Sequence, residues 1–151
     1  MSAGNQLDAN VLSWVKSEID ETLSQARSAL EVYVENTEDE SQLRFCLNYL
    51  HQVLGTLQMV ELYGASMAAE EMEQLTEALL ENKVSNREDA YEVLIRGILQ
   101  LPDYLEQLMN GQPDMPMVLL PLLNDLRASR GESLLSENAL FTPNLSADAP
   151  V

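Results

Sequence analysis

The sequence contains little of what disulfide-stabilised, zinc-binding or nucleic-acid-binding proteins need. Its 151 residues include one cysteine, one histidine and one tryptophan, and only eight are lysine or arginine. A single cysteine, Cys46, excludes an internal disulfide framework and any zinc site built from several cysteines. Because Cys46 is flanked by Phe45 and Leu47, we expect its thiol to be buried and reduced.

Positive charge is scarce, and this restricts the classes of partner. The chain carries 25 acidic residues and a formal net charge of −17. Such a surface repels phosphate backbones and anionic lipid, so we expect neither nucleic-acid binding nor membrane binding. It attracts a partner that has a basic patch.

The chain also lacks long hydrophobic runs. Residues 1–10 show neither the basic nor the apolar region of a signal peptide. The most apolar run, residues 115–123, is short and interrupted by Pro116 and Pro121, so it cannot span a membrane. We therefore expect a cytoplasmic protein.

What the chain does have is a leucine-rich, helical pattern. The apolar fraction is 46% and only 5% of the residues are aromatic. Apolar residues recur at steps of three and four, as on one face of an amphipathic helix, and no stretch alternates with period two. The predicted helices span residues 7–35, 37–64, 66–83, 86–111 and 115–130. Short connections between long helices predict an all-α fold, an antiparallel up-down helical bundle.

Local signals place the ends of these helices. Residues 37–40 (Thr-Glu-Asp-Glu) resemble a capping box at the start of the second helix, and Asn86 is expected to cap the fourth. Pro102 should kink or split the fourth helix. We expect a four-helix bundle over residues 8–111, an additional packing helix over 112–131, and an irregular tail or linker over 132–151.

The only histidine, His51, falls in the second predicted helix. At about 100° per residue, it lies roughly 120° from the centre of the apolar stripe at Leu50 and Leu57, so it should project towards solvent. The candidate partner-binding residues beside it are Arg44, Leu47, Asn48, Gly55, Gln58 and Leu62. The competing interpretation is a structural histidine with satisfied hydrogen bonds.

Gly55 follows His51 by one helical turn. Glycine inside a helix costs about 1 kcal/mol relative to alanine. One reason to accept this cost is access, because a missing side chain lets the backbone of another protein approach the imidazole. The alternative is that Gly55 allows a neighbouring helix to pack closely.

Two catalytic classes fail on the residues available. A carboxylate-bridged metal site in a helical bundle needs paired Glu-x-x-His motifs, whereas the chain has one histidine and Asn48 stands where the glutamate would be. A Cys46–His51 nucleophilic pair fails because five residues on a helix separate the side chains by about 140°. We expect no metal and no cofactor.

The pattern His51-x-Val53-x-Gly55 in an acidic helical bundle resembles the histidine phosphotransfer (HPt) domain of CheA-type kinases, which usually shows H-x-[hydrophobic]-K-G. Residues 44–75 and 115–137 are also similar to the N-terminal region of CheA-like hybrid kinases that control type IV pili and twitching motility. The resemblance covers residues 12–145, and it implies a four-helix HPt core.

This resemblance implies a role for specific residues. His51 would be the phosphoacceptor, and Glu73 on the third helix, with Glu70 one turn earlier, would orient the imidazole. The partners would be a response-regulator receiver domain and a kinase catalytic domain of the same full-length chain, since an HPt domain has no ATP site of its own. The competing interpretation is that Glu70, Glu71, Glu73, Glu77 and Glu81 form the solvated face of an acidic helix.

One departure from the family pattern supports an alternative to phosphotransfer. Leu54 stands where the family has lysine, and Arg44 lies about 10 Å away along the helix axis, too far to replace its charge near a phosphoryl group. The chain also resembles a second protein of these pilus systems, and that resemblance implies a scaffold without a phosphorylatable histidine. The alternative function is therefore a non-phosphorylated docking or scaffold domain for pilus-regulatory partners.

Overall fold

The computed structural model describes residues 9–141 of the chain, with side chains for residues 10–139. Its elements are α1 (Ala9–Glu35), α2 (Glu40–Met59), α3 (Tyr63–Leu80), α4 (Arg87–Met109), the 3₁₀ helix η2 (Pro116–Leu119), α5 (Leu120–Ser129) and α6 (Glu137–Phe141). The described part of the chain contains no strand. The predicted all-α fold is confirmed.

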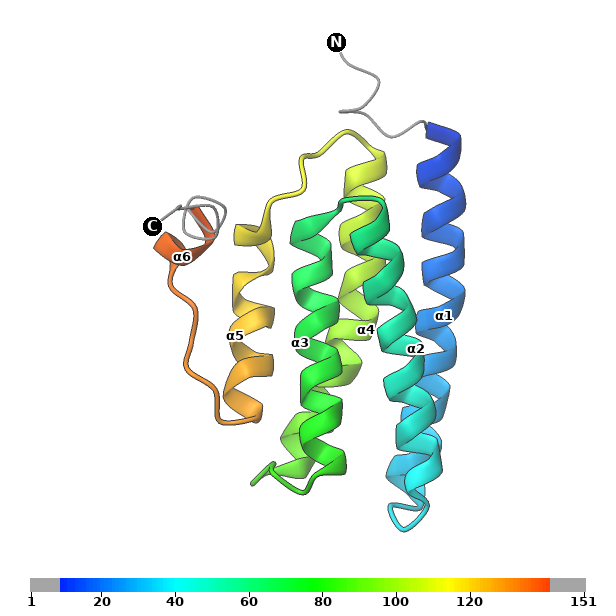
Figure 1. The fold of residues 1–151 in the computed structure, drawn as a ribbon, viewed down its shortest axis with the longest axis vertical. Helices are drawn as coiled ribbons and strands as arrows, with labels where there is room; N and C mark the ends of the chain where they lie inside the picture. Colours follow the sequence, from blue (N-terminus) through cyan, green and yellow to red (C-terminus); the bar gives the residue numbers. More distant parts are fainter. Residues whose placement is uncertain (1–8, 142–151) are drawn as a thin grey trace.

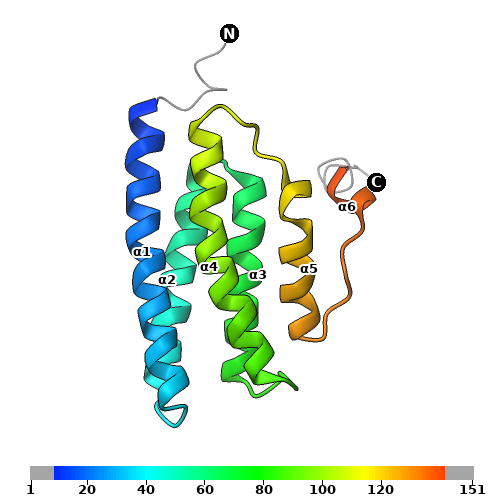
Figure 2. The ribbon, with the colours of Figure 1, turned by 180° about the vertical axis from the view of Figure 1, so that it is seen from behind.

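The first four helices alternate in direction and form a bundle (Figure 1). α1 packs against α2 and α4, and α3 packs against the same two helices. The pairs α2/α3 and α1/α4 therefore form opposite faces, the first in front in Figure 1 and the second in front when the bundle is seen from behind in Figure 2. α5 packs against α3 and α4, so it covers neither of these two faces.

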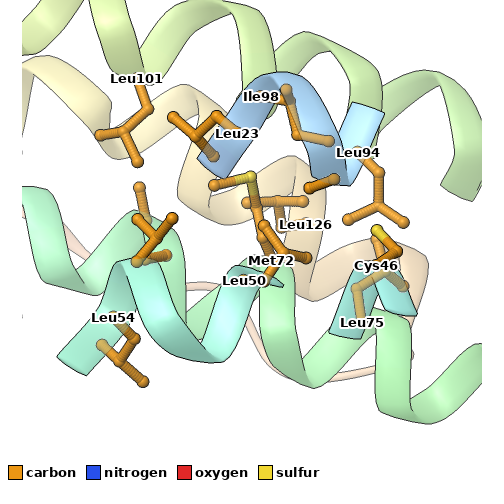
Figure 3. Packing of buried hydrophobic residues seen from close by; sticks show 14 of the residues in the cluster. Leu23, Cys46, Leu50, Leu54, Met72, Leu75, Leu94, Ile98, Leu101 and Leu126 are labelled. Carbon is orange, nitrogen blue, oxygen red and sulfur yellow. The ribbon is translucent and has the colours of Figure 1, made fainter. Parts of the chain in front are cut away.

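The apolar stripes of the helices meet in one core. Figure 3 shows Leu50 of α2, Met72 of α3, Ile98 of α4 and Leu126 of α5 packed together. Each fully buried side chain of this size contributes about 1.5–3 kcal/mol. Cys46 is also buried, as expected, and its burial raises the pKa of the thiol to about 12.

The predicted boundary between the second and third helices is wrong. α2 ends at Met59, and α3 already begins at Tyr63. Glu61 adopts a left-handed φ of 63°, and the Leu62 amide donates to the Leu57 carbonyl at 2.9 Å. These two features close α2 without a glycine, whereas the sequence pattern favoured Gly64 as the helix end.

The starts of α2 and α4 are each capped by one side chain. The predicted capping box at residues 37–40 is wrong, because Asp39 is the cap and its Oδ1 accepts from the Ser41 amide at 3.1 Å. Asn86 caps α4 as predicted, accepting from the Asp89 amide at 3.1 Å. Each such cap contributes about 1 kcal/mol.

α4 runs through Pro102 as one helix and is not split. A proline inside a helix removes one backbone hydrogen bond and costs about 3 kcal/mol. Ile98 and Leu101 before the ring and Leu105 after it are all buried in the core. Packing on both sides of Pro102 therefore holds α4 together against the local preference of the sequence.

The segment after α4 is attached to the start of α3 by Asp114. Its carboxylate accepts from the Gly64 amide at 2.8 Å, the Ala65 amide at 3.1 Å and the Tyr104 hydroxyl at 2.6 Å. α3 has no side-chain cap from Leu62, so Asp114 serves as its N-cap from 50 residues away. A Cβ on Gly64 would lie 2.5 Å from Asp114 Oδ1, which explains the glycine.

Because of Tyr104, we expect the fold to be less stable at alkaline pH. Burial, followed by the hydrogen bond to Asp114, raises the pKa of its phenol well above the usual value of about 10. The unfolded chain loses this proton first, so the contribution of Tyr104 to the free energy of unfolding should be constant below about pH 10 and then fall by up to about 1.4 kcal/mol per pH unit. The buried Cys46 thiol, whose pKa is also raised, adds a separate fall that begins at about pH 8.5 in wild type and variant alike. Urea unfolding from pH 8 to 11.5 measures this slope, which Tyr104→Phe should reduce. An equal slope in the variant would contradict the assignment.

The additional C-terminal helix is shorter than predicted over 115–130. Its first part is the 3₁₀ helix η2, and α5 begins at Leu120.

Glu71 of α3 is buried and accepts from Arg127 Nη1 at 2.8 Å and Arg130 Nη2 at 3.2 Å. These ion pairs attach α5 to α3, and the interpretation of Glu71 as part of a solvated face is wrong.

The expected irregular tail is partly ordered. Asn124 of α5 accepts from the Leu135 amide at 2.7 Å and donates to the Leu135 carbonyl at 3.0 Å. The short helix α6 follows, where the sequence predicted irregular structure. Residues 142–151 of that tail lie outside the described residues.

None of the helices within residues 9–141 is both long and apolar enough to cross a bilayer.

Candidate functional site

His51 lies in the middle of α2 on the face shared with α3, and 71% of its side chain is exposed. Counting positions around the helix predicted this direction correctly. The neighbouring Leu50 and Val53 are buried in the core. The His51 side chain, in contrast, does not pack into the core. His51 is not a core residue.

The imidazole is held from one side by Glu73 of α3. His51 Nδ1 lies 2.8 Å from Glu73 Oε2, and only 17% of the Glu73 side chain is exposed. Because an ionised carboxylate can only accept, Nδ1 donates, and the lone pair of the neutral ring is on Nε2. The contact fixes the tautomer and the ring orientation, and it presents Nε2 to solvent as an acceptor or a nucleophile.

Gly55 leaves open space beside the histidine. A Cβ built on Gly55 would have no atom within 4 Å, apart from its own helix and chain neighbours. The alternative interpretation, that this glycine lets a neighbouring helix pack closely, is therefore wrong for the described residues. The cost of the glycine is not offset by packing inside the domain.

Gly55→Ala should stabilise the domain. The change relieves the entropy cost of a helical glycine without a clash, so we expect the free energy of unfolding to rise by about 0.5–1 kcal/mol. In a chain of this size that corresponds to a melting temperature higher by about 1–4 °C.

Gly97→Ala is the matched control, because a Cβ there would lie 2.6 Å from the sulfur of the buried Met72. Overpacking should lower its free energy of unfolding by about 1–3 kcal/mol. Thermal denaturation of both variants measures the contrast. A destabilised Gly55→Ala would show that the space beside His51 is filled.

The remaining predicted partner-binding residues divide into two groups. Arg44, Asn48 and Gln58 are exposed, and Arg44 pairs with Glu40 at 3.7 Å rather than with any group near His51. Leu47 is half-buried, and the half-buried Leu62 lies beyond the end of α2, packed against the core. We name the exposed residues Arg44, Asn48, His51, Gly55 and Gln58, together with Glu73, the His51 face.

No cation occupies the position where HPt domains carry lysine. Leu54 is 9% exposed and belongs to the core. The neighbouring carboxylate of Glu70 is exposed and accepts from Gln74 at 3.4 Å. A phosphoryl group on His51 would therefore have the carboxylates of Glu70 and Glu73 near it, whereas Arg44, the cation of the His51 face, pairs with Glu40.

Two exposed apolar side chains near this face were not predicted from the sequence as candidate binding residues. Met59 and Tyr63 lie at the turn between α2 and α3, at one end of the helix pair that carries the His51 face, and both are more than half exposed. Exposed side chains of this size are common in protein interfaces. Their position off the apolar stripe, next to a helix end, was the signal available in the sequence.

Comparison with known proteins identifies the family. The model of the FimL C-terminal domain matches residues 6–122. The chain is 30% identical over 142 residues to the scaffold protein FimL of Pseudomonas aeruginosa, an alignment that covers 94% of this chain and 25% of that protein. The chain thus spans about a quarter of the length of this curated relative. The comparison with solved structures gave no significant match.

These findings separate the two resemblances seen in the sequence. The similarity to the pilus-system scaffold, FimL, is confirmed. The similarity to an HPt domain and to the hybrid kinase ChpA is not confirmed by them. Since the family model covers more than half of the sequence, the chain belongs to the FimL C-terminal domain family.

Proposed function

We propose that this domain is a docking module of a scaffold protein and that it binds a protein partner through the His51 face. Membership of the FimL family and the relative's designation as a scaffold protein support this function. The observation that carries it is the open space at Gly55, in the middle of a helix and next to an oriented imidazole. A partner's backbone can approach there more closely than anywhere a side chain projects.

The partner we propose is a receiver domain of the type IV pilus signalling system. The His51 face offers it an acceptor at Nε2, polar side chains on either side, and the apolar pair Met59 and Tyr63 at one end. Polar groups around an accessible apolar anchor are typical of transient interfaces.

A specific observation favours phosphotransfer as the second candidate function. With Nδ1 donating to Glu73, Nε2 is positioned to attack a phosphorus atom in line. The N–P bond would form as the bond to the leaving oxygen of an aspartyl phosphate or of ATP breaks. Without a fixed cation at the position of Leu54, the rate would be lower by about 10²–10³ than in an HPt domain that has one.

The docking proposal is tested by titrating the ¹⁵N-labelled domain with the receiver domains of the pilus response regulators. Gly55→Trp fills the open space and should weaken binding by at least about 100-fold, because the partner can no longer approach the helix. Ser17→Trp, on the exposed side of α1, is the matched control and should leave the affinity within about twofold. Equal affinity for wild type and Gly55→Trp would overturn the proposal.

His51→Gln separates docking from phosphotransfer. The variant keeps a polar side chain on the face, so docking alone predicts a loss of affinity below about tenfold. Incubation with the CheA-like kinase domain, receiver domain and labelled ATP then reports transfer. Acid-labile label on the wild type that His51→Gln lacks would establish transfer, whereas unlabelled wild type that still binds the receiver would leave docking as the function.

A further inference from the structure

A groove of about 580 Å³ lies between the last turns of α1 and the first turns of α4. These two helices form the face of the bundle opposite to α2 and α3, which is in front in Figure 2. Its floor is apolar and consists of Leu30 and Val34 from α1 and Tyr91 and Ile95 from α4. Val34 is 40% exposed, and Ile95 is half-buried. Leu30 and Tyr91 are buried beneath them, so Val34 and Ile95 are the apolar groups that a partner can reach.

Carboxylates line the rim of the groove on both sides. They are Glu31 and Glu35 from α1 and Glu88, Asp89 and Glu92 from α4. We name the floor and the rim together the acidic groove. Five carboxylates around an apolar floor give a strongly negative potential focused on a concave surface.

Most of this charge is not neutralised within the domain. Arg27 pairs with Glu31 at 3.0 Å, and Asn86 donates to Asp89 at 3.1 Å. Among residues 9–141, no lysine or arginine forms an ion pair with Glu35, Glu88 or Glu92. Arg87, the basic residue nearest in sequence, donates instead to Tyr33, Tyr91 and the Leu79 carbonyl. The carboxylates of the rim therefore remain available to a cationic partner.

The position of Glu35 favours a role in binding over a role in helix stability. A helix C-terminus carries a partial negative charge and is stabilised by cations. The last turn of α1 contains no basic residue and ends on Glu35. A carboxylate there destabilises α1 slightly, and a cationic group bound in the groove would remove this effect.

We propose that the acidic groove binds an amphipathic helix of another protein, with leucine-type side chains on the apolar floor and lysines or arginines against the rim. The occupant is not a second copy of this domain, because two domains of charge −17 repel each other. A second copy also offers no free cation, since each of the eight basic side chains already contacts an acidic or other hydrogen-bonding group. The inference does not rest on the His51 face.

The probe is a fluorescein-labelled peptide of about 18 residues, long enough to form a helix on binding, with leucines along one face and lysines on the other. A scrambled peptide of the same composition has no apolar face. Binding is followed by anisotropy at two salt concentrations, and the site is located from amide shifts in ¹⁵N spectra. We expect the designed peptide to bind at least about tenfold more tightly than the scrambled one.

Variants of the rim distinguish the groove from general attraction to an acidic surface. The triple variant Glu35→Gln, Glu88→Gln, Glu92→Gln should weaken binding by about tenfold or more, and Val34→Ser should weaken it severalfold. The control triple Glu18→Gln, Glu61→Gln, Glu77→Gln changes three exposed carboxylates elsewhere by the same net charge. It should change the affinity by less than about twofold.

Several results would overturn the proposal. They are an absence of binding, equal binding of the scrambled peptide, equal weakening by the two triple variants, and amide shifts centred on the His51 face in place of residues 30–35 and 88–95. Melting curves of the variants verify that each is folded. Gly55→Trp, which tests the docking function, should leave peptide binding unchanged, so the two proposals can fail separately.

Discussion

Glu71→Ala is expected to lower the free energy of unfolding by about 3 kcal/mol, one of the two largest effects of a single substitution that we expect. Only 8% of Glu71 is exposed, and its two oxygens accept from Arg127 and Arg130. Removing one partner of a buried ion pair leaves the other charge without compensation, which typically costs 3–5 kcal/mol. Arg130 Nε already has no partner in the described structure, so without Glu71 the Arg130 guanidinium keeps only the exposed Glu132, at 3.5 Å from Nη1.

The loss should appear as a melting temperature lower by about 6–12 °C, measured by circular dichroism. Hydrogen exchange should show α5 losing protection before the four-helix bundle does, because Glu71 connects α5 to α3. Glu70→Ala is the matched control, since Glu70 is exposed on the same helix, and its effect should stay within about 0.5 kcal/mol. A loss below about 1 kcal/mol for Glu71→Ala would show that these ion pairs do not hold α5.

Asp114→Ala is expected to cost about 2–3 kcal/mol. It removes three hydrogen bonds to an ionised acceptor, from the amides of Gly64 and Ala65 and from the Tyr104 hydroxyl. The Tyr104 ring is buried, and an unsatisfied buried hydroxyl costs about 1–3 kcal/mol. The first turn of α3 would lose its N-cap at the same time.

Urea unfolding measures the loss, and amide exchange at Gly64 and Ala65 locates it. Asp114→Asn should recover part of the stability, because an amide oxygen still accepts but carries no charge. Asp103→Ala, an exposed carboxylate on α4, is the control and should be nearly neutral. Unchanged exchange at Gly64 and Ala65 would contradict the role of Asp114 as the cap of α3.

The fold was predictable wherever one short stretch of sequence determines it. Apolar residues at steps of three and four predicted the helices, and Asn86 correctly marked the start of α4. The same counting around α2 placed His51 on an exposed face. Pro102 does not split α4, because core packing on both sides, which no window of sequence shows, keeps the helix continuous.

Contacts between distant residues could not be predicted in this way. Glu71 looks like one of several glutamates on an acidic helix, and only the position of α5 brings Arg127 and Arg130 to it. Asp114 likewise reads as a loop residue until the tertiary structure places it at the start of α3. An alignment with HPt domains did pair His51 with Glu73, because it carried tertiary information that this sequence alone lacks.

The α2/α3 and α1/α4 faces lie on opposite sides of the bundle, which allows two proteins to be bound at the same time. If the His51 face and the acidic groove each bind a protein as proposed, the two proteins lie on opposite sides of the bundle and do not compete for space, so the first leaves the second free to bind. Tethering of this kind raises the effective concentration of one bound protein near the other to the millimolar range when the connection is short. A reaction between two dilute proteins would then proceed as if within one molecule, without any catalytic group in the bundle itself.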